Sequence, residues 1–209
     1  FNRTTNPIRQ RDPNDLLDEI EWVHAEYGLD SFKFCDATWN VSPEHVISFC
    51  EAKIERAITL PWECNVHAGL ASEEMFHWMK KANCHQMNVG CESGSPRILK
   101  SIRKGISVES IVRVFDWARA AGLQRRSYFL IGHPGETEDD IRLTEELVEE
   151  IQPEVFGVTI LCPYPGGDLY DHTKHKDVLW EETDEYSNDF WHTECLSNEE
   201  LKRWQNYLA

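Results

Sequence analysis

Residues 128–140 read YFLIGHPGETEDD, and this stretch decides the fold class of the chain. The apolar run 128–131 predicts a buried strand, the Gly-His-Pro-Gly sequence after it predicts a tight turn, and Thr137 predicts the cap of a helix that starts with acidic residues. A strand, a backbone-rich loop and a helix in this order are typical of parallel α/β proteins, which bind ligands at the carboxyl ends of their strands. We therefore expect the functional site at one edge of a parallel sheet.

The same pattern recurs along the chain about every 25–35 residues, as βα units do. Strands are expected at residues 31–37, 62–68, 85–93, 126–131 and 155–161, with helices beginning after Asp12, Ser42, Ser72, Ser107 and Thr137 and a short helix at 96–103. A closed eight-stranded barrel needs about 250 residues, so 209 residues favour an open or partial barrel. Ser197 and Glu200 form a capping-box pattern that predicts a final helix.

Composition excludes several classes of partner. The net charge of −16 argues against binding of nucleic acid through its phosphates. No apolar run is long enough to span a bilayer, and no signal peptide is evident, so no membrane partner is expected. The seven cysteines form no Cys-x-x-Cys pair, which predicts free thiols and a cytoplasmic protein rather than a disulfide framework. Those beside apolar strand runs are expected to be buried: Cys35, Cys64, Cys91 and Cys162.

Polar side chains gather where the predicted strands end. Glu63, Asn65 and His67 alternate along one strand and share a face, which is either the barrel interior or a wet face at an open edge. Glu92 ends an apolar strand, where a carboxylate is costly unless it has a partner. Either Lys104 neutralises Glu92, or the two residues hold the two ends of a zwitterionic ligand.

Two other sets of polar residues are expected to be solvent-exposed and to bind neither a metal nor a ligand. His172 and His175 have a spacing that a metal could use, but they lack a clear third ligand and are expected to be solvated loop residues. The acidic pairs at 145–146 and 149–150 are expected on the solvated face of a helix.

Five stretches together resemble one family. They are FKFCDATWNVS at 32–42, WECNVHA at 62–68, NVGCESGSPRILKSIRKGIS at 88–107, YFLIGHPGETEDDIRLT at 128–144 and VTILCPYPGGDLYD at 158–171. The chain resembles radical S-adenosylmethionine (SAM) enzymes, particularly the group with cobalamin-binding members and methylthiotransferases. The resemblance implies an α/β fold: a partial (βα)6 TIM-like barrel at residues 1–171, here without its first strand, with a C-terminal helical extension at 172–209.

The resemblance also implies a four-iron four-sulfur cluster held by a Cys-x3-Cys-x2-Cys motif, which this sequence lacks. Phe1-Asn2-Arg3 looks like the continuation of that motif, so the cluster ligands are expected upstream of this chain. No metal ligand is assigned within it, and the fragment is expected to be inactive alone.

The implied cofactor-binding positions carry over one by one. Phe1 would offer backbone groups to the SAM adenine, and Asp36 lies in the second-strand segment near the SAM amino group, without that motif's usual glycines. Glu63 matches a third-strand carboxylate of the coproporphyrinogen-oxidase branch. The remaining positions are Glu92 with Ser93 near the ribose or methionine moiety, Lys104 on the SAM carboxylate, Ile131, Gly132 and Pro134 at the adenine, and Cys162 closing the adenine pocket.

The implied reaction is reductive cleavage of SAM to a 5′-deoxyadenosyl radical that attacks a small-molecule substrate, with ferredoxin or flavodoxin as electron donor. The stretches resemble those of anaerobic magnesium-protoporphyrin monomethyl ester oxidative cyclases, so cobalamin and a tetrapyrrole or other organic substrate are possible partners of the reaction. The alternatives are a methylthiotransferase-like enzyme, a TIM-barrel-like lyase or aldolase that uses Lys104 or Glu92, and a non-catalytic scaffold.

Overall fold

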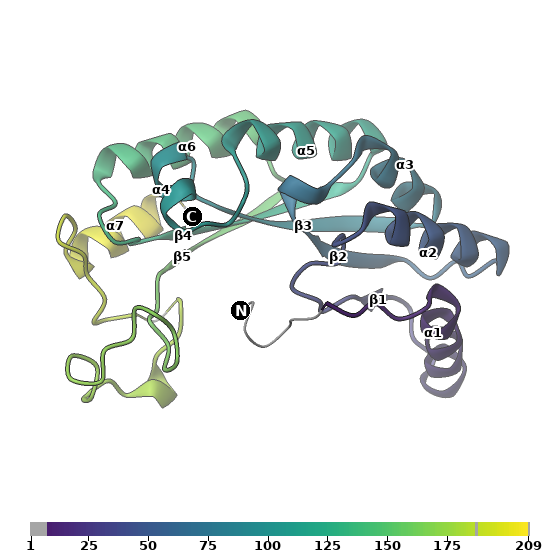
Figure 1. Ribbon diagram of the computed structural model, residues 1–209, viewed down its shortest axis with the longest axis horizontal. Coiled ribbons are helices and arrows are strands. Elements are labelled where there is room, and N and C mark those ends of the chain that lie inside the picture. Colours follow the sequence, from purple (N-terminus) through teal and green to yellow (C-terminus); the bar gives the residue numbers. More distant parts are fainter. Residues whose placement is uncertain (1–7, 187, 209) are drawn as a thin grey trace.

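The protein was examined as a computed structural model, which describes residues 8–186 and 188–208. Five parallel strands form one sheet in the order of the chain (Figure 1). The strands are β1 Phe32–Lys33, β2 Trp62–Val66, β3 Cys84–Glu92, β4 Gln124–Ile131 and β5 Val155–Ile160. The helices are α1 Pro13–Tyr27, α2 Pro43–Glu55, α3 Glu73–Lys81, α4 Pro96–Ser101, α5 Val108–Ala121, α6 Glu138–Ile151 and α7 Asn198–Leu208, with short 3-10 turns η1 Ala68–Leu70 and η2 Trp180–Glu182.

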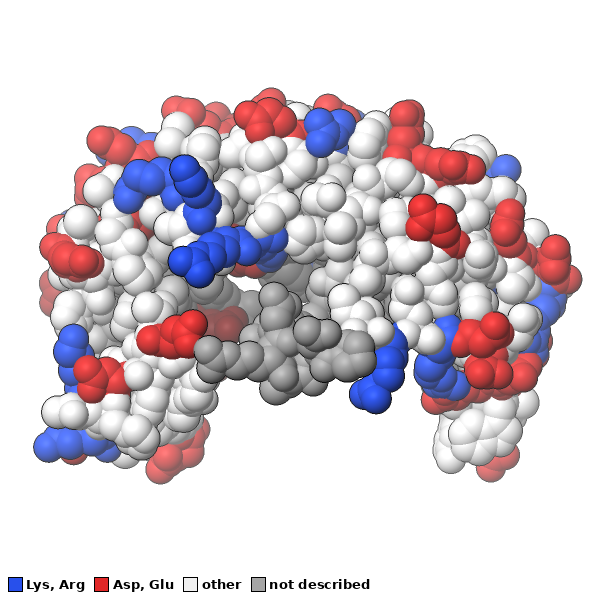
Figure 2. Space-filling view, in the orientation of Figure 1, with Lys and Arg blue, Asp and Glu red and all other residues white. Residues whose placement is uncertain are grey.

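The sheet is covered on one face only. Helices α2, α3, α5 and α6 lie over this face, while α1 and the segment after β5 stand on the two sides of the other face (Figure 1). We call these the covered face and the open face. The arrangement is a half-barrel, which confirms the open or partial α/β barrel expected from the chain length. Figure 2 shows that acidic side chains are spread over the outside of the covering helices, as their exposed positions require.

The helices begin where the sequence predicts, because each predicted cap makes its hydrogen bond. The side chains of Asp12, Ser42, Ser72 and Thr137 accept from backbone N–H groups of the first turn. Gly28 ends α1 in the left-handed conformation, with φ of 66°. These local signals fix the element boundaries without tertiary help.

The first strand is much shorter than expected. Residues 31–37 were predicted as a strand, but pairing with β2 stops at Lys33. Beyond it the chain makes single hydrogen bonds to β2: the N–H of Phe34 donates to the carbonyl of Glu63 at 3.0 Å, and Asn65 Nδ2 donates to the carbonyl of Asp36 at 2.8 Å. Isolated backbone and side-chain hydrogen bonds therefore replace a regular ladder at this edge. As a result Cys35 is exposed, and its predicted burial is wrong.

Alternate residues of each strand pack on the covered face and form the core. Cys64, Met87, Val89, Cys91 and Phe129 are at most 1% exposed there. Each such side chain contributes roughly 1.5–3 kcal/mol by leaving water. The buried free thiols predicted at Cys64 and Cys91 are confirmed, whereas Cys162 is only half-buried.

The segment after the barrel is tied back to it. Leu201 of α7 is fully buried, and Gln205 Nε2 donates to the carbonyl of Val158 in β5 at 3.0 Å. The predicted capping box is confirmed, because the Ser197 N–H donates to Glu200 and the Glu200 N–H donates to Ser197 Oγ. Among the described residues no helix is long and apolar enough to cross a membrane.

Candidate functional site

The end of β3 presents a carboxylate and an amine together. Glu92 is the last residue of β3 and has a φ of 64°, next to a register shift against β4. Its Oε1 forms an ion pair with Lys104 Nζ. A Cβ at Gly90 would lie 2.5 Å from this Nζ and 2.8 Å from Glu92 Oε1, so the pair lies directly over the bare backbone of Gly90. Of the two alternatives for Glu92, the structure shows the ion pair with Lys104, and the alternative of a zwitterionic ligand held between them stays a prediction.

Histidine and asparagine side chains from the neighbouring loops hold this ion pair in place. His67 Nε2 contacts the carbonyl of Lys104 at 2.9 Å, and His67 Nδ1 accepts from the N–H of Gly69 at 3.2 Å, so the ring carries its proton on Nε2. Asn40 accepts from the His67 N–H at 2.7 Å and donates to the His67 carbonyl at 3.1 Å. The loop that carries Lys104 is therefore fastened to the end of β2.

Glu63 lies deeper on the open face, within a row of polar residues. Its carboxylate accepts from Lys33 Nζ at 2.9 Å and from Gln86 Nε2 at 2.7 Å. Asn65 follows two residues later on the same face. The expectation that Glu63, Asn65 and His67 share a face is confirmed, and that face is the interior of the half-barrel.

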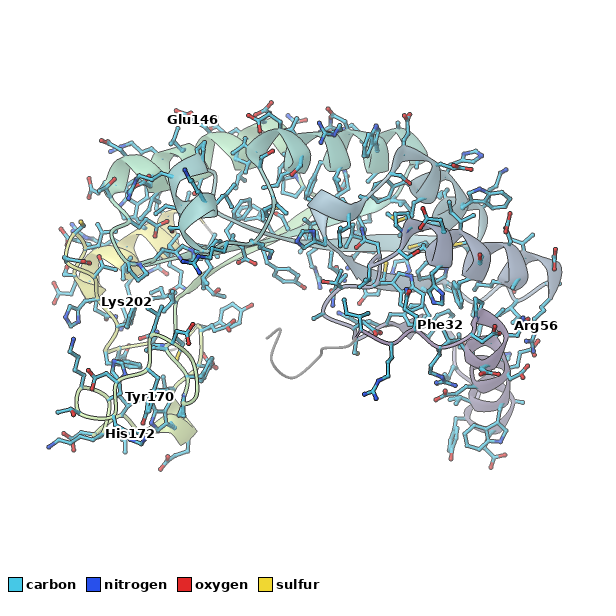
Figure 3. The ribbon with its side chains drawn as sticks, in the orientation of Figure 1. Phe32, Arg56, Glu146, Tyr170, His172 and Lys202 are labelled. Atoms are coloured by element: carbon cyan, nitrogen blue, oxygen red, sulfur yellow. The ribbon has the colours of Figure 1, made fainter. Side chains whose placement is uncertain are left out.

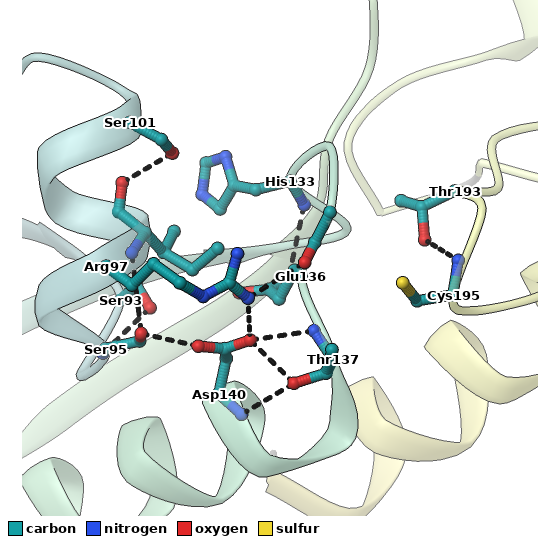
Figure 4. Close-up of polar contacts among 12 residues, drawn as sticks. Ser93, Ser95, Arg97, Ser101, His133, Glu136, Thr137, Asp140, Thr193 and Cys195 are labelled. Carbon is teal, nitrogen blue, oxygen red and sulfur yellow. Dashed lines mark hydrogen bonds and ion pairs between the residues drawn. The ribbon is translucent and has the colours of Figure 1, made fainter.

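The turn after β4 contains a buried carboxylate (Figure 4). Glu136 is fully buried, and its Oε2 accepts from the N–H groups of Gly132 at 2.5 Å and His133 at 3.1 Å, while Oε1 has no partner. Burial raises the pKa of Glu136 to about 7, against the lowering effect of these two hydrogen bonds. His133 is 3% exposed, and burial lowers its pKa. The turn is thus closed by a carboxyl group that titrates near neutral pH.

A second carboxylate at the same turn has the opposite character. Asp140 joins α6 to α4 through Ser95 Oγ at 2.6 Å and an ion pair with Arg97, and it accepts from Thr137 Oγ1 at 2.7 Å (Figure 4). Burial by itself would raise the pKa of Asp140, but these partners outweigh it and lower the pKa to about 2. Asp140 is therefore a charged structural link between two helices.

The β4 turn is also covered from the C-terminal segment. Trp191 Nε1 donates to the carbonyl of Gly132 at 2.7 Å, and the N–H of Leu161 donates to the carbonyl of Ile131 at 2.9 Å. Both polar backbone groups of Gly132 are thus engaged within the protein. Pro134 is exposed and lines a cavity of about 1270 Å³ beneath this turn.

That cavity is lined by aromatic and acidic residues of the C-terminal segment, in which Figure 3 labels Tyr170, a lining residue, and its neighbour His172, which is not one. His175 is 7% exposed and packs against Tyr170, Phe190 and Trp191. The expectation that both loop histidines are solvated is therefore correct for His172 and wrong for His175, because the aromatic rings fold over the second ring. Among the described residues no group of three or more His, Cys, Asp or Glu side chains could hold a metal.

The predicted positions fall into separate places. Glu92 and Lys104 are in contact, Ile131 and Gly132 lie at the end of β4, and the half-buried Cys162 follows β5. Ser93 is fully buried against α6, where its Oγ lies 3.4 Å from Thr144 Oγ1 and accepts from the N–H of Ser95. Asp36 is exposed at the edge of the sheet. Phe1 lies outside the described residues.

The sequence alone did not single out two contributors to this rim. Gly90 makes room for the ion pair, and Trp191 comes from the C-terminal segment. Glu136 belongs to the turn that the resemblance assigns to the adenine, but its role as the buried carboxylate that closes the turn was not predicted. Gln86 and Asn88 were also missed, although the alternation that picked out Glu63 and Asn65 continues on the next strand. Trp191 carries no local signal, because its partner is 59 residues away in the chain.

The chain is similar to a known family of proteins. The family model of the Radical SAM superfamily matches residues 1–148. An uncharacterised methyltransferase of Pyrococcus horikoshii is 27% identical over 164 residues, which are 78% of this chain and 36% of the relative. The anaerobic magnesium-protoporphyrin IX monomethyl ester cyclase of Rubrivivax gelatinosus is 24% identical over 170 residues, which are 80% of this chain and 31% of the relative. The chain thus spans about a third of these relatives.

A solved structure shares the fold. The radical SAM methyltransferase TsrM from Kitasatospora setae, with cobalamin and a [4Fe-4S] cluster bound, matches 74% of this chain and 30% of its own with a TM-score of 0.66 and 23% identity. The half-barrel described above is therefore a known fold of enzymes of this kind.

Proposed function

Because the chain belongs to the radical SAM superfamily, we propose that it is the SAM-binding core of a radical SAM enzyme. The observation that carries the proposal is the ion pair of Glu92 and Lys104 over Gly90, at the carboxyl end of β3. The family uses SAM together with a [4Fe-4S] cluster. SAM's methionine end carries an ammonium and a carboxylate, so one residue of each charge on the open face is a complementary pair.

The residues present fit SAM but not the cluster. Glu92 would accept from the ammonium or ribose, and Lys104 would pair with the carboxylate, each exchanging its present partner for the ligand. Ile131, Gly132, Pro134 and Cys162 would form the adenine wall, and Asp36, Glu63 and Ser93 are proposed as further contacts. The sequence contains no Cys-x3-Cys-x2-Cys motif, so we propose that the cluster ligands come from a segment outside these 209 residues.

When bound, SAM and the reduced cluster supply a 5′-deoxyadenosyl radical that abstracts hydrogen from the substrate. This chain's residues position SAM and exclude water from it. His67 and Asn40 orient the Lys104 loop, and Glu136 with Trp191 fixes the Gly132 turn. An electron donor such as ferredoxin or flavodoxin is part of the proposal.

The proposed reaction is a cobalamin-dependent methyl transfer or an oxidative cyclisation on an organic substrate. It is supported by two relatives that are named a methyltransferase and a cyclase, and by the cobalamin bound in TsrM. The second candidate is a methylthiotransferase-like enzyme. It is supported by a tRNA-2-methylthio-N(6)-dimethylallyladenosine synthase of Nitrosomonas europaea that is 37% identical, but over only 42% of this chain. The proposal includes no membrane partner and no nucleic acid apart from that alternative's substrate, and the seven free cysteines support a cytoplasmic location.

The lyase or aldolase alternative is not favoured. A Schiff-base lysine needs a free amine that can reach a carbonyl, and Lys104 Nζ is engaged in an ion pair with Glu92. A non-catalytic scaffold would have no need of an exchangeable ion pair over Gly90, and this alternative is tested by the two experiments below.

The experiment is calorimetric titration of SAM into the 209-residue chain. We expect Lys104→Met and Glu92→Gln each to weaken SAM binding about 10–100-fold, since a hydrogen bond to a charged group contributes about 1.5–3 kcal/mol. Lys100→Met, at an exposed position on α4, is the matched control and should change nothing. Unaltered affinity in both site variants would remove the pair from the SAM site.

A second measurement tests the chemistry. A longer form of the protein with a Cys-x3-Cys-x2-Cys segment before Phe1 is loaded with iron and sulfide without oxygen, reduced, and assayed for 5′-deoxyadenosine. A reduced cluster that leaves SAM intact would contradict the enzymatic function.

A further inference from the structure

A chain of hydrogen bonds crosses the open face and ends on an unused donor. Lys33 Nζ donates to Glu63, and Gln86 Nε2 donates both to Glu63 Oε2 at 2.7 Å and to Asn88 Oδ1 at 2.8 Å. Because Asn88 Oδ1 faces the donating amide of Gln86, the orientation of the Asn88 amide is fixed. Its Nδ2 is buried and has no hydrogen-bond partner among the residues that the structure describes. A buried amide donor without an acceptor is costly, so an acceptor is expected beside it.

The neighbouring strand supplies a second unused donor at the same level. Arg126 of β4 is the register partner of Asn88 of β3, so the two side chains project from the same face. Arg126 is half-buried, and it makes no hydrogen bond or ion pair with the described residues. The preceding Arg125, on the covered face, is by contrast bound to Glu154 and to the carbonyl of Ile151. One of two adjacent arginines is thus structural, and the other is free on the interior face.

The charges around this point decide the sign of the missing ligand. Glu63 is already neutralised by Lys33, and the Asn65 amide is engaged with the carbonyl of Asp36. The groups at this level that still lack a partner among the described residues are the Arg126 guanidinium and the Asn88 amide N–H. Arginine presents two parallel donors that match the two oxygens of a carboxylate. Neighbouring strands lie about 4.8 Å apart, so one oxygen acid can reach donors on both.

We propose that Arg126 and Asn88 form a binding site for a carboxylate, or a comparable oxygen-acid group, of the substrate. The inference rests on the proposed function, because it takes the interior of the half-barrel as the place where the substrate lies. Arg126 is the accessible member and meets the ligand first. Asn88 adds the third donor from below.

The position along the strands gives the substrate a length. Asn88 lies four residues before Glu92 on β3, which is about 13 Å along a strand. Tyr128 of β4, beside Gly90, lies at a level between them. A substrate whose oxygen acid is bound by Arg126 and Asn88 therefore has its atoms near the proposed SAM site when they lie roughly 10 Å from that acid group. This selects elongated organic acids over small ones.

The test uses nuclear magnetic resonance on the 209-residue chain, without SAM or a cluster. The probes are 4-phenylbutyrate, its neutral amide 4-phenylbutyramide, and 4-phenylbutylphosphonate. We expect the two anions to bind with saturable shifts of the Asn88 side-chain amide and the Arg126 Nε–H, and the neutral amide to bind at least tenfold more weakly. The ratio of the two anion affinities shows whether the site prefers a planar carboxylate or a tetrahedral oxygen acid.

Matched variants make the assignment specific. Arg126→Gln should weaken 4-phenylbutyrate binding at least tenfold, Arg126→Lys should weaken it less, and Arg113→Gln on the outside of α5 should leave it unchanged. If Arg126→Gln does not fold, the affinity of the Arg126→Lys variant and the probe-induced shifts of Asn88 and Arg126 in the unaltered protein test the proposal instead. The proposal would be overturned if 4-phenylbutyrate and 4-phenylbutyramide bound equally well, if neither anion bound, or if the Asn88 side-chain amide signal did not shift. SAM titration of the same samples separates this outcome from failure of the SAM site.

Discussion

The two faces of the sheet carry side chains of opposite character although they come from the same strands. On β4, Ser127, Phe129 and Ile131 are buried beneath the helices, whereas Tyr128 and Leu130 between them are half-buried on the open face. The covered face is held by apolar packing, and the open face carries polar rows that include unused donors. The difference teaches that stability and ligand binding are assigned to alternate residues, so adjacent substitutions should affect different properties.

The largest expected effect is on the covered face. Phe129→Ala should lower the free energy of unfolding by about 3–5 kcal/mol, because it empties a fully packed position. Leu130→Ala, one residue on and half-buried, should cost only about 1 kcal/mol. Urea unfolding monitored by circular dichroism measures both. Equal losses at the two positions would break the comparison between the faces.

The next effect concerns Glu136, at the end of the covered face. A carboxyl whose pKa is raised from 4.5 to about 7 favours the folded state most when protonated, so its contribution is full below pH 4.5 and is lost as pH rises through 7. Relative to Glu136→Gln, the protein should lose about 2–3 kcal/mol of stability between pH 5 and pH 8. Urea titrations at the two pH values give this difference. A parallel pH dependence in both proteins would show that Glu136 is not the titrating group.

The same substitution, Gly→Ala, at two glycines near the end of β3 should affect stability at one position and ligand binding at the other. Gly94→Ala would push a Cβ into the backbone carbonyl of Leu143, which cannot move aside, and should cost about 1–3 kcal/mol or more. Gly90→Ala would meet only the flexible ends of Lys104 and Glu92, so folding should change little. Thermal unfolding and SAM titration separate the two effects: Gly94→Ala should lower the melting temperature, and Gly90→Ala should lower SAM affinity.

The smallest expected effect is at Asp140. Its pKa is lowered from 3.8 to about 2, so its contribution is present above pH 3.8 and is lost as pH falls through 2. Asp140→Asn should cost about 2 kcal/mol or less at pH 7 and clearly less at pH 2, whereas Asp139→Asn in the same helical turn is exposed and should be neutral. Melting temperatures at the two pH values test this, and an equal loss at both would contradict the assignment.

The parts of the fold that depend on local signals could be predicted from the sequence. Helix caps at Asp12, Ser42 and Thr137 lie where expected, because the residue that caps also neighbours the N–H groups it binds. The length of β1 could not be predicted from the sequence, since it depends on how many residues pair with β2 in a regular ladder at the edge of the sheet. The burial of His175 was missed for a related reason, because rings from distant positions cover it.

The candidate site divides in the same way. The Glu92–Lys104 pair was within reach of the sequence, since 12 residues and one short helix separate the partners. The contacts of Ser93 and Gly132 could not be predicted from the sequence, because their partners Thr144 and Trp191 lie far from them in the chain.

By itself the sequence determined the α/β class, the order of the elements, the caps and the alternation of polar residues along the strands, all of which follow from interactions between residues near in the chain. Only the tertiary structure decided which donors are satisfied. Gln86 Nε2 donates to Glu63 and to Asn88 Oδ1, whereas Asn88 Nδ2 and Arg126 donate to no acceptor in the part of the chain that the structure describes. Satisfaction of a donor depends on the position of an acceptor on another strand, and strand register, which sets that position, forms only when the sheet assembles.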